Sequence, residues 1–280
     1  MYDAHTHLQD ARFDSCREAV LAAAMAAGVA GACCCGSSAS DWRAVNALAE
    51  NRGFATGFLL LPAFGVHPWH AGIQPADWLG QLEAYLMRHP ESPVGEIGID
   101  GLRDDPPRDV QRQVLCAQLE LAVRLSRPVV LHGARAWGEL LAIIKPYAPR
   151  LPGLVAHAFG GSADILRDVV AMDGFVSFAG PVCNPAAKRV RAAAAAAPLE
   201  RLLIETDAPD MLPHGAGSRF RAHGSAVGEA SKEDNGPAAE RNHPANLVYV
   251  ARTLATIRGV PVEEIAAVTT ENARRAYRLP

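Results

Sequence analysis

The sequence predicts an α/β fold, a single (β/α)8 TIM barrel that is either regular or distorted, and three observations support this. Eight short apolar runs alternate with longer amphipathic stretches along the chain. Several runs, such as 128–131 and 202–204, are continuously apolar, which is typical of parallel strands covered on both faces. The 280 residues show no break in composition, and such a barrel takes about 250 residues. We therefore expect one domain over residues 1–280.

Each expected strand is a short apolar run, and each expected helix has an apolar face. The strands are expected near residues 1–7, 29–35, 58–66, 93–99, 128–132, 153–158, 174–179 and 201–206. The clearest helix covers 108–126, where apolar residues recur every three or four positions and Gln118 is among the polar residues between them. Its expected buried face consists of Val110, Val114, Ala117, Leu121 and Leu125.

A long loop and C-terminal helices are expected after the eighth strand. Residues 213–241 are rich in Gly, Ser, Glu and Lys and show no periodicity. This composition predicts a mobile loop over the barrel mouth. Helical patterning returns over 242–277, and Asn242 is the expected helix cap.

Net charge and cysteine content limit the partners and the compartment. A protein that coats long duplexes would be more basic than this chain, whose net charge is −3, so we expect contact with nucleic acid only at ends or on single strands. The six cysteines include no Cys-x-x-Cys pair, which favours free, buried thiols in a reducing compartment. No positively charged leader precedes the first strand, and Gly28 and Gly31 interrupt the apolar stretch 19–35. We therefore expect a cytoplasmic protein that does not contact membranes.

Side chains that can bind metals end five of the expected strands. They are His5, His7, Glu96, His132, His157 and Asp207. In a barrel of this type the carboxyl ends of the strands meet at one mouth, so these side chains should converge there. Any one of the histidines alone would more often be a structural core residue, but a group of costly polar residues at one mouth must be paired or ligated. Four imidazoles and two carboxylates suit zinc, manganese or magnesium.

The pattern predicts two ions that share one carboxylate. No lysine stands at an expected strand end, so Glu96 is the best bridging ligand. We assign His5, His7 and Asp207 to one ion, and His132 and His157 to the other. A shared water would be acidified and act as the nucleophile, with Asp207 as the acceptor of its proton.

Other residues near the mouth are expected to hold the substrate or to support the histidines. His67 ends the third strand, and Arg103 and Arg135 follow the fourth and fifth, where guanidinium groups suit phosphate oxygens. The alternatives are a structural role in the loop for His67 and, for the arginines, salt bridges to Asp104, Asp105 or Glu139. Glu205 is expected to orient a histidine. Trp69 and His70 either line the cleft or pack in an ordinary way, and the sequence favours neither. His214, His223 and His243 are expected to be exposed on the surface.

Six motifs in this order resemble the TatD family of metal-dependent deoxyribonucleases. They are His5-Thr6-His7, GVHP at 65–68, GEIGID at 95–100, HAFGGS at 157–162, ETDAP at 205–209 and NHPANL at 242–247. The resemblance implies an amidohydrolase-type barrel with a divalent-metal site and hydrolysis of phosphodiester bonds in DNA, often as an exonuclease acting 3′ to 5′. By motif position it assigns metal binding to the same six residues.

Two positions depart from the family pattern and concern the substrate rather than the metals. Gly101 stands where the family often has an aromatic residue after the GEIGLD-like segment. The family usually has an arginine two residues after the fifth-strand histidine, but here that position is Ala134 and the arginine is Arg135. On a strand, a shift of one residue reverses the side-chain direction, so the sequence leaves open whether Arg135 reaches the phosphate.

Three functions are therefore weighed. The leading one is a phosphodiesterase that acts on DNA, at ends or on single strands, with two metal ions. The alternative keeps the metals but hydrolyses a small cyclic amide, lactone or ester, because one barrel supports many reactions. A non-catalytic metal-binding barrel is the third, and the presence of all six ligands argues against it.

Overall fold

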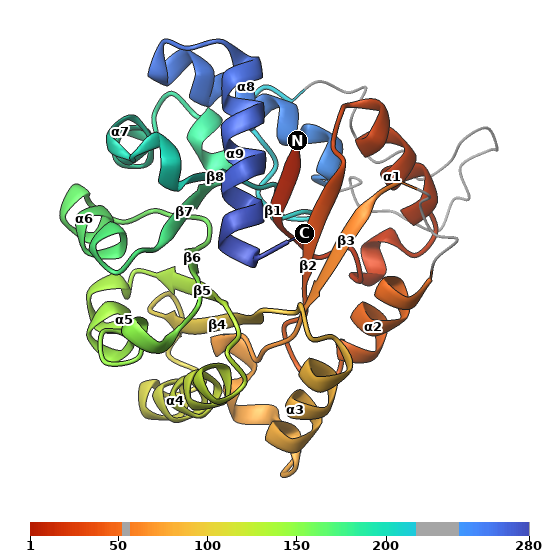
Figure 1. Cartoon of the computed structure of the whole chain (residues 1–280), viewed down its shortest axis with the longest axis vertical. Helices are drawn as coiled ribbons and strands as arrows, with labels where there is room; N and C mark the ends of the chain where they lie inside the picture. The colour runs from red at the N-terminus through yellow and green to blue at the C-terminus, as the bar shows by residue number, and fades with distance from the viewer. Residues whose placement is uncertain (52–56, 217–240, 280) are drawn as a thin grey trace.

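The computed structural model describes residues 1–51, 57–216 and 241–279, and within these ranges eight parallel strands form a ring (Figure 1). Each of the eight expected strands is confirmed, with ends that differ by a few residues. The strands are β1 (Tyr2–Thr6), β2 (Gly31–Cys35), β3 (Leu59–Ala63), β4 (Val94–Asp100), β5 (Val129–Ala134), β6 (Leu154–Ala156), β7 (Phe175–Phe178) and β8 (Leu202–Ile204).

Helices surround the ring and follow the strands in alternation (Figure 1). Those between successive strands are α1 (Arg17–Ala26), α2 (Trp42–Glu50), α3 (Trp78–Arg88), α4 (Arg108–Arg124), α5 (Trp137–Ile144), α6 (Ala163–Ala171) and α7 (Lys188–Ala196). After β8 come α8 (Leu247–Arg258) and α9 (Val262–Tyr277), the expected C-terminal helices. No helix in the described parts of the chain is long and apolar enough to cross a lipid bilayer.

The strands form two hydrogen-bonded sheets, β1–β2–β3 and β4–β5–β6–β7–β8. Backbone hydrogen bonds also cross between the sheets on both sides. Asp207 N donates to His5 O at 2.9 Å between the β8 and β1 ends, and Gly95 N donates to Phe64 O at 2.9 Å between β4 and β3. The expected (β/α)8 barrel is therefore correct, and its distortion lies at these two junctions.

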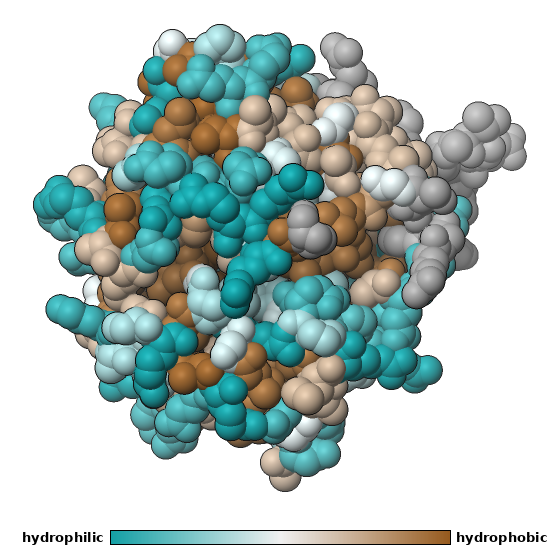
Figure 2. Space-filling model, viewed as in Figure 1, coloured by the Kyte–Doolittle hydropathy of each residue, from teal (hydrophilic) through white to brown (hydrophobic). Residues whose placement is uncertain are grey.

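Helix α9 closes the end of the barrel at which the strands begin, where it lies in front of the ring (Figure 1). Tyr277 Oη donates to Ala4 O at 2.6 Å, and Ala273, Ala276 and Tyr277 pack with buried strand residues such as Cys33. Hydrophilic and hydrophobic residues are interspersed over this face (Figure 2). The opposite end, where the strands finish, is therefore the one that can hold a functional site.

The cysteines are free in the described structure, as expected. Cys33, Cys34 and Cys35 are fully buried in β2, whereas Cys16, Cys116 and Cys183 are only partly buried.

Helix α4 is confirmed, but its buried face is rotated by one position from the expected one. The buried residues are Gln111, Leu115, Gln118, Leu119, Leu121 and Ala122. Two glutamines belong to this face because their amides bind backbone groups at strand ends. Gln118 Oε1 accepts from Val66 N at 2.7 Å, and Gln111 Oε1 accepts from Asp100 N at 2.9 Å. Both bonds fix the chain beside the barrel mouth.

The segment before α8 differs from the expectation. Asn242 is not a helix cap, because a short 3-10 helix, Pro244–Asn246, precedes α8 and Asn246 is the residue at the α8 N-cap. Instead Asn242 is buried, and its Nδ2 donates to Thr206 O at 2.8 Å, which ties this segment to the end of β8. Most of the expected loop 213–241, including His223, lies outside the described residues. His214 is exposed as expected.

His243 is buried, with 3% of its surface exposed, rather than on the surface, and burial lowers its pKa to about 4. The unfolded chain takes up this proton near pH 6.5. The neutral buried ring therefore contributes its full stability above about pH 6.5, and that stability is lost as the pH falls toward 4. Replacing His243 with glutamine should remove about 3 kcal/mol of this acid destabilisation. Urea unfolding of the metal-free proteins between about pH 7 and pH 4 measures the difference, and parallel stability curves would contradict it.

Candidate metal centre

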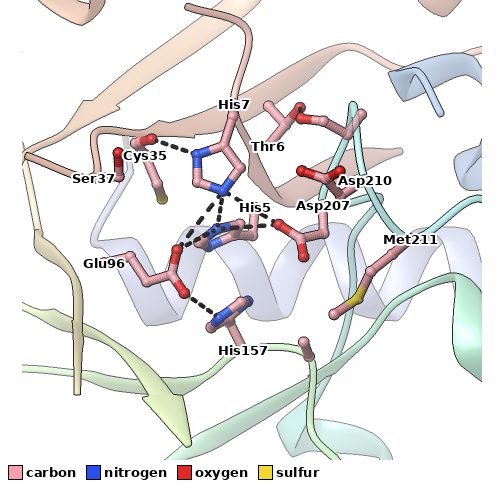
Figure 3. Close-up of polar contacts among 12 residues, drawn as sticks. His5, Thr6, His7, Cys35, Ser37, Glu96, His157, Asp207, Asp210 and Met211 are labelled. Carbon is pink, nitrogen blue, oxygen red and sulfur yellow. Dashed lines mark hydrogen bonds and ion pairs between the residues drawn. The ribbon is translucent and has the colours of Figure 1, made fainter. Parts of the chain in front are cut away.

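Six side chains from five strands converge at the carboxyl end of the barrel. They are His5 in β1 and His7 just after it, Glu96 in β4, His132 in β5, His157 after β6 and Asp207 after β8. Figure 3 shows His5, His7, His157 and Asp207 gathered around Glu96. These are the residues that the sequence predicts as metal ligands, and the structure brings all of them together.

The first group surrounds one point between β1 and β8. His5 Nε2 and His7 Nε2 are 3.2 Å apart, and Asp207 Oδ1 lies 3.5 Å and 3.3 Å from them. Glu96 Oε2 lies 3.3 Å from His5 Nε2 and 3.7 Å from His7 Nε2. Two ligands on one zinc ion, with bonds of about 2.1 Å, are about 3 to 3.5 Å apart. These four side chains are therefore spaced as ligands of one ion.

The second group uses the other oxygen of Glu96. His157 Nε2 lies 2.6 Å and His132 Nδ1 lies 2.7 Å from Glu96 Oε1, and the two nitrogens are 3.2 Å apart. His67 Nε2 is 3.5 Å from the same oxygen. Each oxygen of Glu96 therefore faces a different set of imidazoles.

The second ring nitrogens of His7 and His132 are hydrogen-bonded to acceptors outside the cluster, and that of His157 lies at ion-pair distance from a carboxylate. His7 Nδ1 lies 2.7 Å from Cys35 O (Figure 3), His132 Nε2 lies 2.9 Å from Asp100 Oδ2, and His157 Nδ1 lies 3.5 Å from Glu205 Oε1. Such contacts fix the orientation of a metal-binding imidazole.

Sequence reasoning missed Asp100 as one of these partners. Its signal is its position in the same strand as Glu96, four residues further on, which puts both side chains on one face. Asp100 also carries a pKa lowered to about 2, because hydrogen bonds from His132 and the Leu102 backbone outweigh the effect of burial.

Glu205 is expected to hold His157 in place and thereby to strengthen metal binding. It is fully buried, and it also accepts from Ala158 N at 2.6 Å and from the Ser177 hydroxyl. The Glu205→Gln substitution should weaken metal affinity by about 10- to 100-fold. Competition with a coloured chelator measures this, and Glu200→Gln, the same change at an exposed position, is the control. Equal affinities for the two variants would show that Glu205 does not support the site.

The buried charges of the cluster favour a cation. Burial raises the pKa of Glu96, but the neighbouring imidazoles reverse this and hold it well below its usual range. Burial disfavours the charged form of His7, yet the hydrogen bond and charge of Asp207 raise its pKa to about 9. In the metal-free protein, protons on imidazoles therefore balance the two carboxylates. A divalent cation would replace those protons, since metal ligands must be deprotonated.

Two glycines in β4 allow the close approach that the site needs. A Cβ on Gly98 would lie 1.9 Å from His132 O, and one on Gly95 would lie 2.6 Å from Val130 Cβ. Any larger residue at either position would push β5 away and move His132 with it.

The residues predicted to hold the substrate lie at different depths. His67 is buried beside the second group, and its Nδ1 accepts from Trp69 N at 3.1 Å. Arg103 is exposed and makes no ion pair with described residues; its Cζ lies 3.5 Å from the centre of the Trp69 ring. Glu139, the suggested partner of these arginines, pairs with Arg112 instead. Trp69 lies close enough to Asp100 to lower the pKa of its carboxyl, so an indole lies beside the strand end that Gly101 follows.

Arg135 does not follow the alternation expected of a strand. Its φ is 50°, a left-handed conformation, so the rule that a shift of one residue reverses the side chain does not apply. Arg135 lines a cleft of about 680 Å³ that also reaches His132 and His157. The one-residue shift from the family position therefore does not take Arg135 out of this cleft.

The barrel and its ring of histidines and carboxylates are those of a metal-dependent hydrolase. The chain belongs to the TatD related DNase family, whose model matches residues 2–278. The resemblance seen in the motifs is thus confirmed.

Individual relatives cover the whole chain. It is 34% identical over 284 residues to the protein named 3′-5′ ssDNA/RNA exonuclease TatD of Pantoea vagans, with 100% of both chains covered. It is 29% identical to the uncharacterized metal-dependent hydrolase YabD of Bacillus subtilis, with 100% of this chain and 99% of that protein covered. The crystal structure of YJJV, a TatD homolog from Escherichia coli, has a TM-score of 0.84 and 32% identity and covers 100% of this chain and 98% of its own.

Proposed function

We propose that this chain is a single-domain nuclease that removes nucleotides from the 3′ end of single-stranded DNA or RNA with two divalent metal ions. The observation that supports this proposal most is that the two carboxylate oxygens of Glu96 face different histidines. Oε1 faces His132 and His157, and Oε2 faces His5 and His7. The exonuclease name of the relatives supports the choice of substrate.

The chain's residues divide the work of such a reaction. Ions held by the two groups would supply Lewis-acid chemistry at the phosphate and at the attacking water. His5, His7 and Asp207 would hold one ion, His132 and His157 would hold the other, and Glu96 would contribute an oxygen to each. The second oxygen of Asp207, Oδ2, makes no hydrogen bond to described residues, so it can accept the proton of the attacking water. His67 and Arg103 are positioned at the mouth to hold a non-bridging phosphate oxygen.

The exonuclease relatives favour a phosphodiester over the cyclic amide, lactone or ester of the alternative hypothesis. The complete donor set argues against a non-catalytic barrel, because clustered buried ligands are costly to keep without a use. The free cysteines of the described residues and a nucleic acid substrate support a cytoplasmic location.

Digestion of end-labelled strands tests the proposal. Single-stranded DNA, single-stranded RNA and duplex DNA labelled at the 5′ end are incubated with the protein, with a chelator, and with zinc, manganese or magnesium added back. We expect a ladder that shortens from the 3′ end on the single strands, is abolished by the chelator and returns with metal. A panel of small cyclic amides and lactones is run in parallel, and metal-dependent hydrolysis of these alone would overturn the proposal.

A further inference from the structure

The cleft beside the metal centre is larger than the scissile phosphate requires. It has a volume of about 680 Å³, within the range of sites that hold a whole small molecule. It begins at His132 and His157 and extends over the loops after β5 and β6 to the start of α7. Its described lining residues are His132, Gly133, Ala134, Arg135, Trp137, His157, Ala158, Gly160, Gly161, Ser162, Ile165, Arg189 and Met211.

Two guanidinium groups line this cleft without a partner. Neither Arg135 nor Arg189 forms an ion pair or a side-chain hydrogen bond with the described residues, and both are exposed. The described lining contains no carboxylate, so no described lining residue compensates these two positive charges in a chain whose net charge is −3. An exposed guanidinium that faces a cavity is well suited to a phosphate, which it can bind through two parallel hydrogen bonds.

Apart from His132, His157 and Ser162, the rest of the described wall consists of glycine and apolar residues, which suit a sugar and a base. The Trp137 ring is held in place on two sides. It packs so closely on Gly133 that a Cβ there would lie 2.5 Å from ring atoms, and its centre lies 5.2 Å from the centre of the Phe159 ring. Met211 is 37% exposed, and Figure 3 shows it beside Asp207, so it marks the border with the metal centre. Positive charge next to an apolar wall matches the chemistry of one nucleotide unit.

Resting on the proposed function, we propose that this cleft is a subsite for the nucleotide on the 5′ side of the scissile linkage, and that Arg135 and Arg189 bind its phosphate. The terminal nucleoside on the 3′ side carries no further phosphate, so a second phosphate can come only from the remaining strand. The subsite makes the strand, rather than one phosphodiester, the preferred substrate. Arg189 is the second residue of α7, and none of the sequence motifs includes it.

Removal of one charge from the substrate tests the subsite. Two oligonucleotides are compared, one natural and one with an uncharged methylphosphonate, as separate diastereomers, at the second linkage from the 3′ end. For the unaltered protein, kcat/KM for release of the terminal nucleotide should be about 10- to 100-fold higher on the charged strand. In Arg135→Ala and Arg189→Ala that ratio should fall toward one, and the salt dependence on the charged strand should become shallower by about 0.7 per lost phosphate contact.

Arg43→Ala is the matched control, since Arg43 is an exposed arginine on α2, remote in the fold from this cleft, and its loss changes net charge equally. Arg43→Ala should keep the full ratio of kcat/KM between the charged strand and the methylphosphonate strand. The amount of bound metal, measured in each variant, shows whether the metal centre is still formed. An unchanged ratio in both cleft variants, or an equal fall in Arg43→Ala, would overturn the subsite. If the unaltered protein does not cleave the natural strand in a chelator-sensitive way, the proposed function itself is rejected. Failure of the subsite and failure of the proposed function therefore give different results.

Discussion

Replacing Glu96 with glutamine is expected to lower kcat/KM on a single-stranded oligonucleotide by at least about 1,000-fold, which corresponds to about 4 kcal/mol of transition-state stabilisation. Oε1 of Glu96 lies 2.6 Å from His157, 2.7 Å from His132 and 3.5 Å from His67, and Oε2 lies 3.3 Å from His5 and 3.7 Å from His7. Glutamine keeps the shape but removes the charge and turns one of these atoms into a donor. The loss therefore affects both ligand groups at once.

Metal analysis of the same variant separates loss of ligands from loss of fold. The bound metal should fall from two ions per chain to one or none, while circular dichroism stays the same. Glu120→Gln on α4 makes the same change at an exposed position and should keep full activity and metal. A Glu96→Gln protein with two ions and normal activity would show that Glu96 is not the bridge.

The convergence of the site could be predicted because it depends on the regular part of the fold. His132 and His157 each follow an apolar run, and a parallel barrel sends the ends of all such runs to one mouth. The two-residue spacing of His5 and His7 places both imidazoles on one side of β1, and their Nε2 atoms are 3.2 Å apart. Local pattern and topology together were sufficient for these positions.

Residues whose role depends on tertiary hydrogen bonds could not be predicted in this way. Gln118 looks like a polar helix residue until Val66 supplies a backbone donor and acceptor, which makes it a buried one. Asn242 looks like a helix cap until Thr206 O accepts from it. Arg135 has a positive φ and is not in a strand conformation, so the rule that strand side chains alternate in direction does not apply to it. In each case the decisive partner is distant in sequence or lies in an irregular segment.

Replacing Asp207 with asparagine should lower kcat by about 1,000-fold and remove one metal ion while leaving the other. Asp207 Oδ1 lies 3.3 Å from His7 Nε2 and 3.5 Å from His5 Nε2, so the substitution affects the first ligand group directly. The second group, around Oε1 of Glu96, keeps both of its imidazoles. Asp210→Asn is the control on the same turn, because its ion pair with Arg12 is exposed and contributes about 0–1 kcal/mol.

The pH dependence of metal binding distinguishes this explanation from general damage to the site. The Asp207 carboxylate raises the pKa of His7 to about 9, so in the unaltered protein a proton must leave His7 when metal binds below that pH. Apparent affinity should therefore rise with pH until about 9. Without the carboxylate, burial lowers the pKa of His7, and the rise should end at a lower pH. Metal titrations of both proteins across this range measure the effect. A variant with weaker binding but an unchanged pH profile would show that Asp207 does not control the charge of His7, and that the first ligand group is not organised around their pairing.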